Sequence, residues 1–114
     1  MLADEGYGVI QMNFRGSTGY GVAFEKAGRK QWGDVMLNDI NDATRWLVDN
    51  ALAEPSRICI VGEVFGGYAA MMSAVKHPDL YECAASLNGI SDLYSAVAEG
   101  RRYVGGFYFR RHIG

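Results

Sequence analysis

The sequence of 114 residues predicts an α/β fold, in which a parallel sheet is flanked by helices in three layers. Short, continuously apolar runs predict strands buried on both faces, and segments with helical periodicity separate them. Their order is strand, helix, strand, helix, strand, which is typical of right-handed βαβ crossovers. A three-stranded parallel sheet leaves two long edges to cover, so we expect residues 1–114 to be a fragment of a single larger domain.

The first third of the chain predicts a strand, a loop and a short helix. Residues 7–14, YGVIQMNF, form an apolar run bounded by glycine and arginine, which predicts a buried strand. The glycines and small polar residues of RGSTGYG, residues 15–21, predict a loop, and residues 22–28 can form a short helix. Residues 2–8 resemble the end of a helix that begins further upstream.

The clearest helix is expected over residues 35–52, VMLNDINDATRWLVDNAL. Its apolar stripe recurs at helical spacing: Met36, Ile40, Ala43, Leu47 and Ala51, widened by Leu37, Thr44 and Val48. The other face carries charged residues that we expect to be solvated rather than catalytic: Asp39, Asp42, Arg45 and Asp49. Pro55 cannot continue the helix, so the chain is expected to turn there.

The second half of the chain predicts two more strands with a helix between them. Residues 58–61, ICIV, predict a short buried strand, and the small residues of 66–76 predict a helix that packs closely on the sheet. His77 and Pro78 end that helix, and residues 83–89, CAASLNG, predict the third strand. Residues 91–100 can form a short helix or a loop.

Two cysteines, Cys59 and Cys83, each lie in an apolar stretch that predicts a strand. We expect both to be buried thiols that pack as small hydrophobic side chains. Their separation fits no zinc pattern, and two cysteines do not make a disulfide framework. The sequence predicts neither a metal site nor a cofactor.

Composition and charge narrow the class of protein. A hydrophobic content of 49% and a charged content of 21% are those of a globular domain and argue against disorder. A net charge of −2 gives no electrostatic case for nucleic acid, and we expect the basic and aromatic residues 100–114 to be a solvated tail. No apolar run reaches the roughly 20 residues of a membrane span, and no signal peptide is visible, so we expect a cytoplasmic protein.

The stretch ICIVGEVFGGYAA, residues 58–70, contains the motif that indicates a catalytic site. An apolar strand runs into a glycine-flanked turn and then into a small-residue helix, which resembles the nucleophile elbow Gly-x-Ser-x-Gly of α/β-hydrolases. Gly62, Gly66 and Gly67 are the structural glycines, since side chains there would collide with the neighbouring strand and helix. Phe65 would supply a backbone N–H to an oxyanion hole, and Val64 occupies the position of the serine.

Three flanking segments make the resemblance specific. NFRGSTGYG at 13–21, HPDLYECAAS at 77–86 and NGISDL at 88–93 surround the turn in the order and spacing of the prolyl oligopeptidase family. The likeness covers residues 2–104. It implies part of an α/β-hydrolase catalytic domain of a serine peptidase that acts on peptides through a serine–aspartate–histidine triad. The family's aspartate and histidine are expected beyond the position of residue 114, and its second oxyanion donor, a tyrosine, before residue 1.

Val64 has no nucleophilic atom, so covalent catalysis at this position is impossible and we expect the chain to be inactive. A β-branched residue is also a poor occupant of the strained backbone that a nucleophile elbow requires. We therefore expect a relaxed or poorly determined turn rather than a well-ordered Val64 at positive φ.

Other side chains are poor replacements for the triad. The remaining serines are Ser73, Ser86, Ser91 and Ser95. His77 is expected to lie at a helix end, His112 comes too soon after the turn to be the base, and Asp92 suits the capping of a loop. A dinucleotide site, with Glu82 twenty residues after Gly62, is disfavoured because Val64 replaces its second glycine.

Two interpretations of the inactive chain stay open. One is a non-catalytic pseudoenzyme that serves in binding or assembly, and the other is a truncated fragment without a selected function. Its partners would be missing parts of the same domain or a homologous subunit, with peptides as substrates only in intact relatives.

Overall fold

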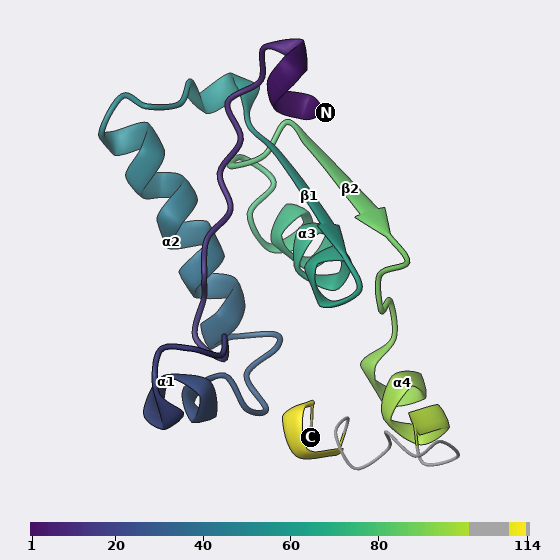
Figure 1. Ribbon diagram of the computed structural model, residues 1–114. Helices are drawn as coiled ribbons and strands as arrows, with labels where there is room; N and C mark the ends of the chain where they lie inside the picture. Colours follow the sequence, from purple (N-terminus) through teal and green to yellow (C-terminus); the bar gives the residue numbers. More distant parts are fainter. Residues whose placement is uncertain (101–109, 114) are drawn as a thin grey trace.

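The computed structural model describes residues 1–100 and 110–113 (Figure 1). The elements in chain order are η1 (Leu2–Glu5), α1 (Val22–Ala27), α2 (Val35–Asp49), η2 (Pro55–Arg57), β1 (Cys59–Glu63), α3 (Phe65–Lys76), β2 (Cys83–Leu87) and α4 (Leu93–Gly100). Most of the predicted basic and aromatic tail lies outside the described residues. No helix in the described part of the chain is both long and apolar enough to cross a membrane.

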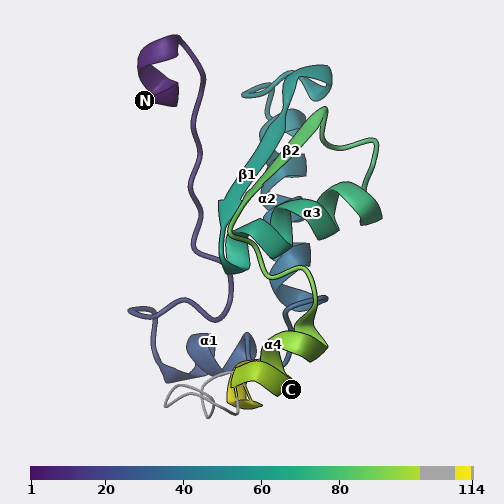
Figure 2. The ribbon, with the colours of Figure 1, turned by 90° about the vertical axis from the view of Figure 1, so that its right-hand side faces the viewer.

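The strands β1 and β2 form a parallel sheet, and α3 is the crossover between them. The register runs without a bulge from the pair Cys59 and Cys83 to the pair Glu63 and Leu87. Helix α3 packs against both strands, and α2 packs against α3, so α3 and α2 lie on the same side of this sheet (Figures 1 and 2). The predicted α/β class, a parallel sheet with flanking helices, is confirmed.

The prediction of a buried strand over residues 7–14 is wrong. The segment is extended, but no backbone hydrogen bond joins it to β1 or β2 in the described part of the chain. Both views show it running beside the sheet and apart from it (Figures 1 and 2). The side chains of Tyr7, Val9 and Ile10 are exposed, Ile10 at 62%. An apolar run becomes a strand only where a neighbour pairs with its backbone, and the sequence does not show the neighbour.

The hydrophobic core lies at the carboxyl end of β1. Trp32, Met36 and Tyr68 are buried there, and Phe14 and Phe65 pack against them. The ring of Phe65 meets Trp32 edge-on, with centroids 4.7 Å apart, and lies 5.1 Å from the ring of Phe14. Each such aromatic pair contributes about 0.5–1.5 kcal/mol beyond the area that it buries. The first residue of α3 is therefore fixed from two sides.

Helix α2 differs from its predicted stripe in its polar residues. Asn41 is completely buried, and its Oδ1 accepts a 2.7 Å hydrogen bond from the hydroxyl of Tyr81, which also lies 3.0 Å from Thr44 Oγ1. Ala51, expected on the stripe, lies beyond the end of the helix and is exposed. Helical spacing indicated the face correctly near Met36, but it cannot show that a distant tyrosine donates to the oxygen of a buried amide.

Asp39 is also not part of a solvated face. Its carboxylate accepts hydrogen bonds from the backbone N–H of Arg15 at 2.9 Å and from Arg15 Nε at 2.8 Å. The hydrogen bonds from the Arg15 side chain hold the pKa of Asp39 below its ordinary value. This pair ties the end of the extended segment 7–14 to α2.

The two cysteines form a disulfide, so the expectation of two buried thiols is wrong. Cys59 and Cys83 are register partners with Cα atoms 4.6 Å apart, and both are exposed. Side chains alternate along a strand, and these two cysteines lie on the face that is turned away from α3. The sequence places each cysteine at the start of a strand but does not reveal that the two strands start side by side.

Candidate functional site

The turn between β1 and α3 is the candidate site. β1 ends at Glu63, α3 begins at Phe65, and the single residue between them, Val64, has φ 53° and ψ −111°. The expectation of a relaxed turn is therefore wrong. A valine at positive φ is a conformational outlier that costs about 1–3 kcal/mol and persists only where the surroundings impose it.

Three backbone hydrogen bonds impose the conformation of Val64. Its N–H donates to the carbonyl of Leu87 at 3.2 Å, which continues the pairing of β1 with β2 by one residue. Its carbonyl accepts from the N–H of Tyr68 at 3.2 Å, the first bond of α3, and from the N–H of Ile90 at 3.4 Å. Strand, helix and the loop after β2 thus all bond to the peptide groups of one residue. The side chain, in contrast, is 52% exposed.

The three glycines of the turn differ in what they permit. A Cβ at Gly62 would overlap the carbonyl of Gly66, and a Cβ at Gly67 would lie 2.6 Å from the Cα of Gly89. At Gly66 a Cβ would meet nothing within 4 Å, and its φ lies outside the left-handed region. Close approach of the backbone therefore requires Gly62 and Gly67, whereas the expected collision at Gly66 does not occur.

The N-terminus of α3 offers backbone donors next to Val64. The first N–H groups of a helix have no intrahelical partner, and no side chain of the described residues caps this end. No acceptor for the Phe65 N–H is found within residues 1–100 and 110–113. With the aromatic packing of its ring, Phe65 holds this N–H beside the exposed Val64 side chain, where the positive end of the helix dipole also favours an anion.

His77 lies far from this turn, and His112 contacts Lys30 through its backbone. His77 follows the last residue of α3, as predicted, and its Nδ1 lies 3.2 Å from Arg45 Nη2. Twelve residues of helix, about 18 Å, separate it from Val64. The backbone carbonyl of His112 accepts a 2.6 Å hydrogen bond from the N–H of Lys30.

Asp92 and the serines have structural positions. Asp92 Oδ1 accepts from the N–H groups of Tyr94 at 2.9 Å and Ser95 at 3.3 Å, so the predicted capping role is confirmed. Hydrogen bonds from Ser95 hold the pKa of Asp92 below its ordinary value. Ser73 is fully buried in α3, while Ser86 and Ser91 are exposed. In the described part of the chain, no hydrogen bond joins a serine hydroxyl to a histidine.

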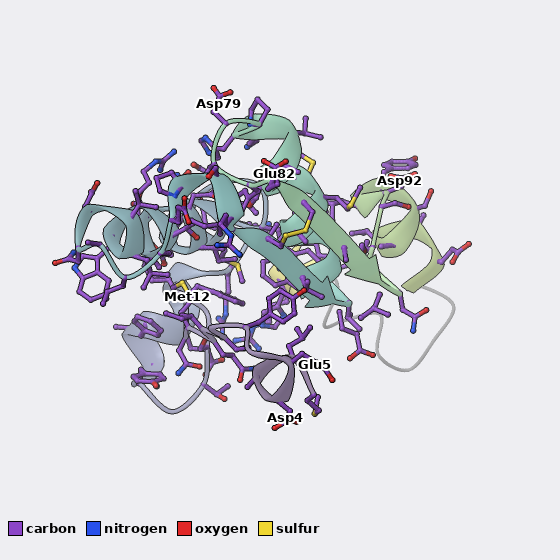
Figure 3. The ribbon with its side chains drawn as sticks, turned by 90° about the horizontal axis from the view of Figure 1, so that it is seen from above. Asp4, Glu5, Met12, Asp79, Glu82 and Asp92 are labelled. Carbon is purple, nitrogen blue, oxygen red and sulfur yellow. A yellow bond between two sulfur atoms is a disulfide. The ribbon has the colours of Figure 1, made fainter. Side chains whose placement is uncertain are left out.

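Strand direction argues against the dinucleotide interpretation. Glu82 precedes β2, and its N–H donates to the carbonyl of Ile58, just before β1, at 2.8 Å (Figure 3). The Val64 turn follows the other end of β1. Because the strands are parallel, Glu82 and the turn lie at opposite ends of the sheet, whereas a dinucleotide site needs both at the carboxyl ends.

Comparison with known proteins identifies the scaffold. The model of the prolyl oligopeptidase family matches residues 1–105. Dipeptidyl aminopeptidase BIII of Pseudoxanthomonas mexicana is 35% identical over 107 residues, which are 94% of this chain and 16% of that protein. Dipeptidyl peptidase family member 6 of Caenorhabditis elegans is 38% identical over 96 residues, 84% of this chain and 13% of that protein.

Solved structures agree with this assignment. A puromycin-hydrolyzing peptidase of Mycobacterium tuberculosis superposes with a TM-score of 0.79 at 39% identity, over 90% of this chain and 16% of its own. A puromycin hydrolase superposes with a TM-score of 0.80 at 31% identity, over 90% of this chain and 15% of its own. The chain thus spans between about an eighth and a sixth of the length of these relatives. It belongs to the prolyl oligopeptidase family of α/β-hydrolases.

Proposed function

We propose that the chain is a segment of a serine peptidase catalytic domain whose nucleophile position is occupied by Val64, and that this chain does not hydrolyse peptides. The observation that carries the proposal is the turn itself. Its backbone has the sharp strand-to-helix geometry of a nucleophile position, on a chain that belongs to a peptidase family, yet its side chain is a hydrocarbon.

The chemistry of acyl transfer explains why the substitution is decisive. A serine at this position attacks the scissile carbonyl with Oγ while a histidine accepts its proton, and an oxyanion hole stabilises the tetrahedral intermediate. Valine has neither an atom to form the acyl bond nor a proton to transfer. The Phe65 N–H could still stabilise an oxyanion, which by itself binds a carbonyl without activating it.

A serine alone would not restore turnover. In the described residues, His77 lies at the far end of α3 and Asp92 caps α4, so neither forms a base–orienter pair next to residue 64. A nucleophilic serine without such a pair keeps the ordinary, unreactive hydroxyl. The expected activity of a Val64→Ser chain is therefore that of the uncatalysed reaction, apart from a small contribution of the oxyanion donor.

The partner that suits this chain is the remainder of a catalytic domain, from the same polypeptide or from a homologous subunit. β1 pairs only with β2, so one edge of β1 presents unpaired N–H and C=O groups among the described residues. Val61 and Leu87 are exposed although they lie in parallel strands, which ordinarily are covered on both faces. A strand added at this edge would pair with the open backbone groups of β1. A layer added on this face would cover Val61 and Leu87.

A non-catalytic binding or assembly module is the second candidate. It is favoured by the intact supports of the turn, since all three backbone hydrogen bonds of Val64 are present without a serine to position. A chain of this kind would bind peptides weakly beside the Phe65 N–H and release them unchanged.

Labelling with a fluorophosphonate probe tests the proposal. The wild-type chain and the Val64→Ser variant are incubated with the probe, with an intact family peptidase as the positive control. We expect no stoichiometric labelling of the wild-type chain and no peptidase turnover by either form. Stoichiometric labelling of wild type at any serine, or turnover by Val64→Ser alone, would overturn it.

Calorimetric titration with a dipeptide amide separates the two candidates. Saturable heat that is lost in a variant with Phe65→Pro, which removes the N–H, supports a peptide-binding module. No heat from either chain leaves the inactive segment as the better interpretation.

A further inference from the structure

The disulfide between Cys59 and Cys83 bridges the two strands of the sheet at their first register pair. Figure 3 shows the sulfur bridge between β1 and β2, and both cysteines are exposed. Neither cysteine lies at the nucleophile position, Val64, which follows the other end of β1. The bridge therefore needs an explanation of its own.

The position of the bridge relates it to the Val64 turn. The loop that it closes has a sequence separation of 24 and contains β1, Val64 and α3. At the other end of the sheet the N–H of Val64 bonds to the carbonyl of Leu87. The register of β1 against β2 is thus fixed covalently at one end and by the backbone of the strained turn at the other. A shift of β1 against β2 by one residue would break both the disulfide and the hydrogen bond between Val64 and Leu87. It would also turn every side chain of the shifted strand to the opposite face of the sheet.

The sheet has little else to hold its register. It has two strands in the described part of the chain, and parallel pairing is somewhat weaker per residue than antiparallel pairing. Two-stranded sheets are marginal by themselves. Helix α3 covers one face, and two of the register partners in β2, Ala84 and Ala85, have small side chains. A covalent bridge contributes more in such a sheet than in one that is buried on all sides.

We propose that Cys59–Cys83 is a thiol–disulfide exchange site, open to small thiols from solvent, whose oxidation state controls the pairing of β1 with β2 and thereby the backbone of the Val64 turn. A thiolate of a dithiol attacks one of the two Sγ atoms, forms a mixed disulfide and releases the other cysteine as a thiolate. The second thiol of the reductant then displaces the first cysteine. The protein gains two electrons and two protons, and the dithiol becomes a cyclic disulfide.

Exposure makes a specific kinetic prediction. A bridge that solvent reaches in the folded chain is reduced by dithiothreitol at a rate within about tenfold of the rate in a denaturant. The measurement is a time course of quenching with iodoacetamide, read by intact mass, with and without guanidinium chloride. A folded-state rate that is slower by about a thousandfold, or two alkylatable thiols in the air-oxidised protein, would overturn the proposal.

The effect on the sheet is measured separately. Reduction is expected to lower Tm by roughly 10–20 °C, as the release of a loop of this length predicts. Hydrogen exchange should show the largest loss of protection at the amides of Gly62 and Val64, which face β2, with a smaller loss in α2. Loss of protection in α2 that equals the loss in β1 would contradict a local effect on the sheet, as would an unchanged Tm.

The matched control removes the sulfur atoms without adding a crosslink. The double variant Cys59→Ala/Cys83→Ala should have the Tm of the reduced wild-type chain and should not respond to dithiothreitol. A response of the double variant would show that the reductant acts elsewhere and would overturn the assignment. If the double variant does not fold, the mass-resolved reduction rate of the wild-type chain still decides the proposal.

Discussion

The Val64 turn and the segment of residues 7–14 contrast in how well they are held. Val64 has an unfavourable backbone conformation, yet strand, helix and loop all bond to it. Residues 7–14 have a favourable extended conformation and an apolar sequence, yet none of their backbone groups pairs with β1 or β2 in the described part of the chain. The intrinsic backbone preference of the residues therefore does not determine how firmly either region is held. In both regions this depends on how many neighbouring segments form hydrogen bonds with the backbone.

The largest effect is expected when a side chain is added where the backbones of the turn approach each other most closely, at Gly62. Gly62→Ala places a Cβ on the carbonyl of Gly66, so strand and helix must separate, and we expect a loss of about 3 kcal/mol or more in unfolding free energy. Unfolding in urea measures this loss of unfolding free energy. Gly66→Ala is the matched control, because the open space there predicts a gain of about 0.5–1 kcal/mol. Equal losses in the two variants would contradict the described geometry.

A second variant relieves the strain instead. Val64→Gly removes the conflict between a β-branched side chain and φ 53°, and the lost side chain was half exposed. The relief outweighs the extra chain entropy of glycine, so we expect a stabilisation of about 1 kcal/mol. Thermal unfolding of wild type and variant checks the sign. A destabilised variant would mean that the valine side chain, rather than the backbone bonds, holds the turn.

The anchor of the extended segment predicts a smaller, pH-dependent effect. Arg15 holds the pKa of Asp39 below its ordinary value of 3.8. The pair therefore stabilises the fold above that value, and this contribution is lost as pH falls through the depressed pKa of the folded state. Asp39→Asn should be less stable than wild type near pH 7 by about the size of a partly exposed ion pair, and the two should converge in acid. The unfolding free energies of wild type and Asp39→Asn, measured from about pH 7 into acid, check this prediction. A difference between the two that does not change with pH would contradict the linkage to the ionisation of Asp39.

The smallest effect is expected in the unpaired segment itself. Ile10→Thr alters a side chain that is 62% exposed, so the unfolding free energy should change by no more than about 0.5 kcal/mol. Met36→Ala, in the core, should lose about 2–5 kcal/mol and serves as the comparison. A large loss for Ile10→Thr would mean that residues 7–14 are paired in solution. Addition of a complementary domain segment should increase the cost of Ile10→Thr, because the side chain would then be covered.

The disulfide also bears on the compartment of this protein. The cytoplasmic location stays a prediction, and in a cytoplasm thioredoxin and glutathione would keep Cys59 and Cys83 reduced. The sheet would then depend on its backbone bonds and on whatever covers its open face. In an oxidising compartment the bridge would be present, as the structure has it.

Local patterns predicted much of the fold. Helices α2 and α3 and both strands lie close to their expected residues, because hydrophobic periodicity and the proline and glycine breaks act within one segment. The capping role of Asp92 was predicted for the same reason, since its partners are two and three residues away. The failures are non-local. The pairing of Cys59 with Cys83, the burial of Asn41 against Tyr81 and the contact of Asp39 with Arg15 join residues 24 or more positions apart.

The sequence by itself determined the family, the place of the turn and the loss of the nucleophile. These follow from covalent structure: a valine has no oxygen wherever the chain places it. Only the tertiary structure decided that Val64 keeps a positive φ, that a Cβ at Gly66 would find open space and that the apolar residues 7–14 have no strand partner among the described residues. Each of these depends on which backbone groups from distant parts of the chain arrive at hydrogen-bond or van der Waals distance, and one segment read alone does not contain that information.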